Sequence, residues 1–186
     1  MENTVKKRLS EFFNKISAPL RRPFLTFRML EAAELDMFDE IPSWVEKGAN
    51  FHAEYETALA QSSRGGALEV VKYLVEQGAD IHSGADRALR TAIHHGHTDV
   101  VKYLYEQDRN PACSPQLLLI TAVDAGRNDI ISYFLENGIG ITSVNDDAYQ
   151  IARNEKHPDI VKIFDTYLEQ KAQMQSNTQK RPAAKM

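Results

Sequence analysis

The sequence has little of what many catalytic and metal-binding sites require. It contains one cysteine, Cys113, so no disulfide can form within the chain and no cysteine pair can hold zinc. No apolar run approaches the roughly 20 residues that a membrane-spanning helix needs. No uninterrupted apolar stretch follows the basic N-terminus, as a secretory signal would require. A glycine-rich phosphate-binding loop after a strand pattern is also missing. We therefore expect a chain without catalytic residues, cofactor, metal or small-molecule substrate.

Charge is unevenly distributed along the chain. The net charge of the whole is −4, but residues 1–28 carry +5, residues 29–170 carry −13 and residues 171–186 carry +4. Such an imbalance bears on partners and solubility rather than on fold. The acidic middle disfavours nucleic acid along its length, because phosphates would be repelled there. The two basic ends are the segments suited to anionic partners.

The most prominent feature of the sequence is a phrase that recurs every 30 residues. "GGALEVVKYLVEQGADI" at 65–81 is followed in step by "GHTDVVKYLYEQ" and "GRNDIISYFLEN". Two apolar columns keep this period, one with Val70, Val100, Ile130 and Ile160, the other with Leu74, Leu104, Phe134 and Phe164. A single active site does not need such repetition. The period predicts an array of similar units, each of which needs its neighbours to bury a core.

Each repeat contains two short helical patterns. In "LEVVKYLVEQG" the apolar residues Val70, Val71, Leu74 and Val75 lie on one helical stripe, and Gly78 supplies a left-handed stop. An earlier, shorter pattern such as "DRALRTAIHHG" ends in a glycine in the same way. We therefore expect a helix-turn-helix in every unit.

These residues resemble the ankyrin-repeat family. "ETALAQSSRGGALEVVKYLVEQGADI" at 56–81 is similar to the family pattern T-P-L-H-x-A-A, then G-H, a valine- and leucine-rich helix and G-A-D. Ala58 stands where proline is usual and Ala60 where histidine is usual. The family period is about 33 residues, so the shorter spacing implies that the β-hairpin finger is reduced to a turn. Units of this length resemble those of giant DNA viruses, and similar units occur in some bacteria and phages.

The resemblance implies an all-α solenoid of about five helix-turn-helix units over residues 22–170. The units are 22–51, 52–81, 82–111, 112–141 and 142–170. The first and last units depart from the pattern, as is expected of repeats whose outer face meets water. "EQDRNP" places Asp108 where a glycine stop belongs, which predicts an irregular junction there.

The segments outside the array have their own patterns. Residues 1–21 contain a basic amphipathic helix pattern that Pro19 ends. This helix would either cover the open end of the array or lie, through residues 5–20, on a membrane or in a partner's groove. Residues 171–186 are polar and aperiodic, which predicts a disordered basic tail. "KRPAAK" in this tail resembles part of a nuclear-import signal.

The family resemblance also implies where a partner would bind, on a concave face built from the turn before each first helix and from the exposed side of that helix. The column before the helix holds Glu56, Asp86, Gln116 and Asp146. The columns near its end hold Arg64, His94, Asp124 and Asn154, with His95 beside His94. Three of the four residues in the first column are acidic, which favours a partner with a basic or mixed-charge surface. The same carboxylates also suit helix N-termini, and both roles can hold. The resemblance places His97 at the family's G-H position, which usually has a loop hydrogen-bonding role, and places His94 and His95 in columns that vary among ankyrin units. We therefore do not expect these three histidines to be metal ligands.

Together these features predict a non-enzymatic, monomeric protein–protein interaction module in the cytoplasm. The resemblance adds a host-directed or defence-blocking role if the source is viral or microbial. Two alternatives belong to other classes. One is a peripheral membrane or nucleic-acid adaptor anchored by its basic N-terminal helix. The other is an acidic decoy that occupies a DNA-binding protein. The basic tail leaves nuclear localisation as an alternative to the cytoplasm.

Overall fold

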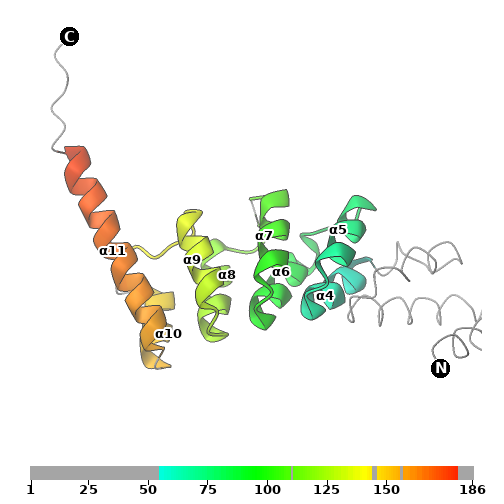
Figure 1. Cartoon of the computed structure of the whole chain (residues 1–186), viewed down its shortest axis with the longest axis horizontal. Helices are drawn as coiled ribbons and strands as arrows, with labels where there is room; N and C mark the ends of the chain where they lie inside the picture. The colour runs from blue at the N-terminus through cyan, green and yellow to red at the C-terminus, as the bar shows by residue number, and fades with distance from the viewer. Residues whose placement is uncertain (1–54, 110, 144–145, 156, 180–186) are drawn as a thin grey trace, which may run out of the picture. The chain divides into compact units, whose positions relative to one another are not determined.

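The computed structural model describes residues 55–109, 111–143, 146–155 and 157–179, which form eight helices and no strand (Figure 1). The helices are α4 (Tyr55–Gly65), α5 (Leu68–Glu76), α6 (Ser83–His95), α7 (Thr98–Gln107), α8 (Pro115–Asp124), α9 (Asn128–Glu136), α10 (Asp147–Asn154) and α11 (Pro158–Gln179). One helix pair lies in each predicted unit from 52–81 to 142–170, and turns replace hairpins between the pairs. This confirms the all-α repeat architecture. The predicted N-terminal helix and the unit 22–51 lie outside the described residues.

The chain divides into two compact units, Met1–Leu89 and Arg90–Met186, whose boundary falls inside α6. In the first unit, α4 packs on α5. In the second, α8 packs against α9 and α10, α11 packs against α9 and α10, and α7 packs against α9. A helix of the second unit thus contacts both its own pair and a neighbouring pair. Such contacts let short helices bury a shared core in series.

The two apolar columns predicted from the sequence form this core. Every residue in them is at most 3% exposed, and Phe134 and Phe164 are completely buried. The helices also end as predicted. The first helices share a backbone hydrogen bond. A residue two or three positions after the helix donates its amide to a carbonyl five positions earlier. The donor and acceptor pairs are Ala67 to Ser62, His97 to Ala92, Arg127 to Ala122 and His157 to Ala152, at 2.9–3.0 Å. Gly66, Gly96 and Gly126 lie at positive φ (66–83°) just before these donors, which is why a glycine recurs there.

α7 ends differently from α5 and α9. Gly78 and Gly138 have φ of 93° and 87° after α5 and α9, and each is followed by a bond back into the helix. After α7, Asp108 instead takes extended angles (φ −146°, ψ 117°). The irregular junction predicted at Asp108 is therefore confirmed. The left-handed conformation that ends α5 and α9 has a higher steric cost for aspartate than for glycine.

The prediction of a disordered tail is wrong for residues 171–179, which continue α11. Six of its nine residues are lysine, alanine, methionine or glutamine, which favour helix even without an apolar stripe. The extension is also held at its base. The Lys171 Nζ lies 5.5 Å from the centroid of the Tyr167 ring. That ring lies over Gly140, where an added Cβ would come within 2.5 Å of the Tyr167 hydroxyl oxygen. Aperiodic polarity here marks an exposed helix rather than disorder.

The turn that opens α6 is strained. Gly84, Ala85 and Asp86 all have left-handed angles, with φ of 60°, 55° and 57°, so right-handed helix begins only at Arg87. A left-handed angle costs a residue with a Cβ about 1–2 kcal/mol relative to glycine. The short spacing between repeats is thus achieved here with two non-glycine residues in an unfavourable conformation.

We expect Ala85→Gly to raise the free energy of unfolding by about 1 kcal/mol, because glycine adopts a φ of 55° without the steric cost of a Cβ. The matched control is Ala172→Gly, on the exposed extension of α11, which should lower stability by roughly 0.5–1 kcal/mol through the greater flexibility of glycine. Urea denaturation followed by circular dichroism measures both. Equal losses in the two variants would contradict the left-handed turn.

Candidate functional site

Three of the residues predicted before the first helices lie where a partner could reach them. Glu56 is exposed in the first turn of α4, and Gln116 is exposed in the first turn of α8. Asp146 precedes α10 and is half-buried. Its carboxylate accepts a hydrogen bond from the Ala148 amide at 3.2 Å. Asp146 therefore caps its helix and keeps part of its carboxylate in solvent.

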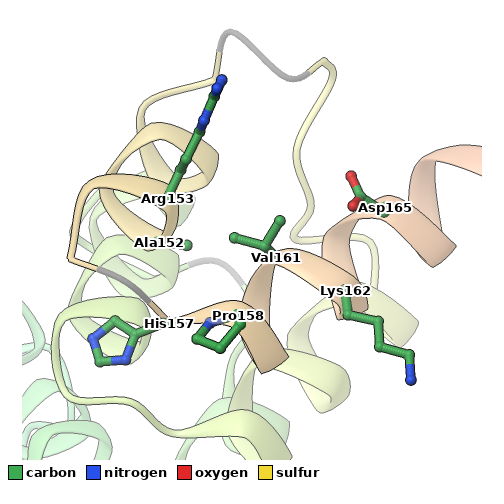
Figure 2. A pocket seen from close by; sticks show the side chains of 7 residues that line it. All are labelled: Ala152, Arg153, His157, Pro158, Val161, Lys162 and Asp165. Carbon is green, nitrogen blue, oxygen red and sulfur yellow. The ribbon is translucent and has the colours of Figure 1, made fainter.

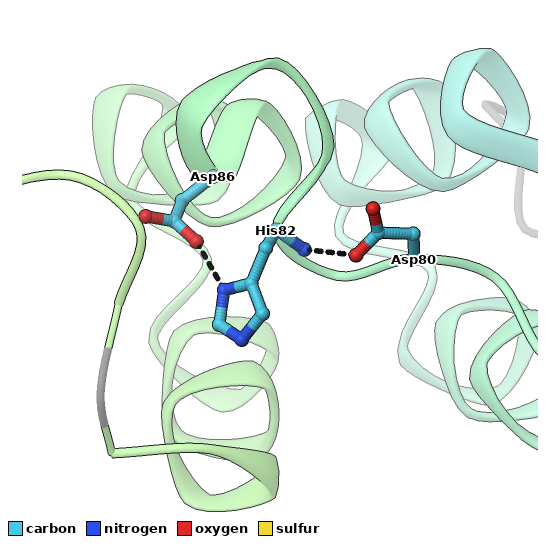
Figure 3. A network of polar contacts seen from close by, with 3 residues as sticks. All are labelled: Asp80, His82 and Asp86. Carbon is cyan, nitrogen blue, oxygen red and sulfur yellow. Dashed lines mark hydrogen bonds and ion pairs between the residues drawn. The ribbon is translucent and has the colours of Figure 1, made fainter.

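Asp86 does not belong to this exposed set, which corrects the sequence prediction. The residue is only 1% exposed, and its Oδ1 lies 2.7 Å from Nδ1 of His82 (Figure 3). The His82 amide in turn donates to Oδ1 of Asp80 at 2.9 Å. The left-handed angles at Gly84–Asp86 turn the carboxylate inward, and the sequence carries no direct signal of those angles. Asp86 holds a turn together, so it cannot serve as the exposed contact of an acidic decoy.

The residues predicted near the ends of the first helices are all exposed. Arg64 lies in the last turn of α4, and His94 and His95 end α6. Asp124 ends α8, and Asn154 ends α10. α8 and α10 pack together, and Gly126 after α8 lies beside His157 after α10. Because equivalent ends adjoin, Asp124 and Asn154 lie at one end of this helix pair and Gln116 and Asp146 at the other.

Arg127 joins two successive repeats, a role that sequence reasoning missed. Its Nε and Nη2 donate to the His94 carbonyl at 3.1 and 2.7 Å. The same guanidinium lies over Gly96, where an added Cβ would come within 3.1 Å of it. A charged, forked donor at a helix end satisfies carbonyls that the helix leaves unpaired. The available signal was positional, since His97, Arg127 and His157 share one column of the repeat.

We expect Arg127→Ala to lower the free energy of unfolding by about 1–2 kcal/mol, because a hydrogen bond from a charged group to an exposed helix end is lost. Arg127→Lys should restore only part of this, since an ammonium group cannot form the fork. Arg153→Ala, at an exposed arginine, is the control and should stay within about 0.5 kcal/mol of the parent. Urea denaturation measures the free energy of unfolding of each variant. Similar losses at Arg127 and Arg153 would contradict a stabilising contact between Arg127 and the end of α6.

The three histidines near the end of α6 are close but not convergent. The ring centroids of His94 and His95 are 5.2 Å apart, and those of His95 and His97 are 6.4 Å apart. Among the described residues, no group of three or more histidine, cysteine, aspartate or glutamate side chains is placed to hold a metal ion. The histidines therefore contribute polar, titratable surface.

Two tyrosines of the second unit have raised pKa values. Burial raises the pKa of Tyr133, with the nearby Glu106 carboxylate adding to the effect. The pKa of Tyr149 is raised chiefly because its hydroxyl donates to Asp165 Oδ1 at 2.8 Å. The Tyr133 ring also packs edge-on against Tyr105, with centroids 6.1 Å apart. These phenols stay protonated and join helices, so they are packing groups rather than reactive ones.

The second helices carry an acidic column that the sequence prediction overlooked. An exposed carboxylate lies in the first turn of α5, α7, α9 and α11, in the order Glu69, Asp99, Asp129 and Asp159. Negative charge there suits the positive end of the helix dipole. The acidic character of the middle segment is therefore shared between first and second helices. A test of the predicted surface needs controls on the second helices.

The family model for ankyrin repeats, in three copies, matches residues 29–114. Residues 29–114 are therefore similar to ankyrin repeats, and α8 to α11 continue the helix pairs beyond the matched residues. A search of curated proteins finds no match. Within the part of the chain that the structure describes, no helix has the length and apolar character needed to cross a bilayer. Ankyrin repeats are in general protein–protein interaction modules, and the family is typically non-enzymatic.

Proposed function

We propose that this protein is a non-enzymatic binding module that holds another protein on its first-helix surface. We define this surface by Glu56, Arg64, His94, His95, Gln116, Asp124, Asp146 and Asn154. The observation that supports the proposal is their placement. Each lies at an end of a first helix and is exposed or half-buried, while the apolar columns between the helices are closed to solvent. The polar ends of the first helices are thus available to a partner.

The charges of this surface indicate the kind of partner. Glu56, Asp124 and Asp146 are acidic, whereas Arg64 and the two histidines supply positive or titratable groups. A partner with a basic or mixed-charge face would complement them. Complementary charge mainly accelerates encounter and selects partners, and it weakens as salt is added. A cytoplasmic location, a monomeric state and a host-directed or defence-blocking role belong to the same proposal.

A backbone that is fixed at the C-terminal ends of α4, α6 and α8 supports such a role. Glycine stops end α4, α6 and α8 in the same way, and Arg127 ties the end of α6 to the next repeat. Side chains on a rigid scaffold lose less conformational freedom when a partner binds. Within each compact unit, the ends of the first helices would act as preformed contacts that need no folding upon binding.

The test is an affinity capture from lysate of the cells in which the protein acts, with two variants of equal charge. One is Glu56→Lys/Asp124→Lys/Asp146→Lys on the first-helix surface. The other is Asp99→Lys/Asp129→Lys/Glu136→Lys on the second helices. We expect the captured partner to be lost with the first variant and kept with the second. Circular dichroism must show that both remain folded.

Capture that survives the first variant and fails with the second would place binding on the second helices and refute the first-helix surface. A salt titration of the captured complex is a further check. If charge complementarity contributes as proposed, the association rate should fall as the ionic strength rises. An association rate that does not change with salt would contradict the charge argument.

A further inference from the structure

The last helix pair carries an open hollow between α10 and α11, with a volume of about 440 Å³ (Figure 2). Its floor is apolar and is formed by Ala152, Pro158 and Val161. Figure 2 shows Val161 and Ala152 facing each other between the two helices. Arg153 and Lys162 form the rim, and their side chains extend away from the floor in different directions.

The preceding repeats show what covers this position. Val101 and Ile131 share the column of Val161, and both are 0% exposed, whereas Val161 is half-buried. The cover on Ile131 comes from the next pair, because α8 packs against α10 and α9 against α11. The hollow is therefore the same helix-receiving surface, with its apolar floor retained. Its natural occupant has the shape of a helix.

The rim differs from the earlier repeats in charge. Ile93 and Val123 are buried in the column that Arg153 continues, so an apolar contact has been replaced by a cation. Among the described residues, no hydrogen bond or ion pair engages the side chain of Arg153 or Lys162. The carboxylate at the rim, Asp165, already accepts a hydrogen bond from Tyr149. Asp165 keeps its negative charge, so Arg153, Lys162 and Asp165 together give the rim two cations and one carboxylate, a net positive charge.

This charge selects among occupants. The C-terminal residues after α11 include Lys180, Arg181 and Lys185, which have the same sign as the rim and would be repelled. Another apolar repeat would leave Arg153 buried without a partner, at a considerable desolvation cost. An occupant with carboxylates beside an apolar stripe satisfies both the floor and the rim.

We propose that the hollow between α10 and α11 is a second docking site, distinct from the first-helix surface, for an amphipathic helix of another protein. The occupant places an aliphatic side chain on Val161 and Ala152, and acidic residues on the two flanks of its apolar stripe pair with Arg153 and Lys162. The site requires nothing of the first-helix surface, so each surface can be tested while the other is intact.

The test uses fluorescence anisotropy with the full chain and a labelled peptide of about 18 residues. The peptide carries leucine at every third or fourth position and glutamate on both flanks of that stripe. A twin with lysine in place of glutamate is the comparison. We expect the glutamate peptide to bind at least about tenfold more tightly than the lysine twin. Val161→Asp should abolish binding of the glutamate peptide, and Arg153→Glu/Lys162→Glu should reverse the preference.

Two matched variants keep the result specific. Lys102→Glu/Arg109→Glu changes the same charges elsewhere in the second unit and should leave binding unchanged. The Glu56→Lys/Asp124→Lys/Asp146→Lys variant should also bind the glutamate peptide like the parent, whatever its effect on the captured partner. The proposal would be overturned if Val161→Asp left binding unchanged, if the two peptides bound equally well, or if neither bound at millimolar concentration. So would sedimentation showing that the parent pairs with itself and that Val161→Asp makes it monomeric, because the occupant would then be a second copy.

Discussion

Replacing Asp86 by alanine is expected to lower the free energy of unfolding by about 2–3 kcal/mol. The carboxylate is almost completely buried and lies 2.7 Å from His82 Nδ1. Its removal leaves the imidazole without this partner and opens a small void. The loss should fall below that of a fully buried ion pair, because the His82 side chain is 30% exposed and water can replace part of the contact. Urea denaturation followed by circular dichroism gives the difference.

Asp86→Asn is the matched control for that experiment. Asparagine keeps the shape of the side chain and tolerates a φ of 57° well, so only the charge is removed. We expect a smaller loss, about 1 kcal/mol. Combining His82→Ala with Asp86→Ala should show less than the sum of the two separate losses, because the residues share one interaction. An Asp86→Ala variant as stable as the parent would mean that the carboxylate does not hold this turn.

The largest loss is expected at the core of the second unit, where Phe134→Ala should lower the free energy of unfolding by about 3–5 kcal/mol. Phe134 is 0% exposed, and its ring contacts those of Tyr105 and Tyr133 at centroid distances of 5.9 and 6.0 Å. Truncation would leave a cavity bounded by two aromatic rings that cannot collapse into it. Thermal and urea denaturation of the variant measure this loss.

The repeat itself supplies the control, because leucine occupies the same column at Leu74 and Leu104. Phe134→Leu should therefore cost only about 1 kcal/mol, the usual range for a hydrophobic exchange that largely keeps its volume. If the alanine and leucine variants unfolded at the same denaturant concentration, the column would not be a packed core. The contacts of Phe134 with Tyr105 and Tyr133 would then contribute little to stability.

The regular parts of the fold were predictable because they depend on spacing alone. The apolar columns, the glycine stops and the irregular end of α7 at Asp108 all follow from the 30-residue period. Burial of Asp86 did not follow, because a column fixes a residue's place in the repeat but not the backbone angles before its helix. The extension of α11 was missed because helix was expected only where an apolar stripe was present.

The candidate surface was predicted in part for the same reason. Glu56, Gln116, Asp124 and Asn154 lie at exposed helix ends, as their columns implied. The contact from Arg127 to His94 depends on a long side chain that reaches into the preceding repeat, and the sequence shows only the position of that residue. The hollow beside Val161 lies where no further helix pair of the described residues packs on α10 and α11. Comparison of burial along a column reveals it, but comparison of residue types does not.

The hydrogen bond between Arg127 and the end of α6 has a consequence for how repeats could be added to this chain. An in-frame tandem duplication of residues 112–141 would present the copied arginine to the carbonyl of Asp124, the position equivalent to His94. Both the recipient glycine and the carbonyl are already in place there. The contact between the copied repeat and the original would thus repeat the existing contact between Arg127 and His94. The lengthened chain should resist urea better than its parent, because each added repeat contributes another interface. Recombination within this coding sequence can therefore add a unit without first evolving a new junction.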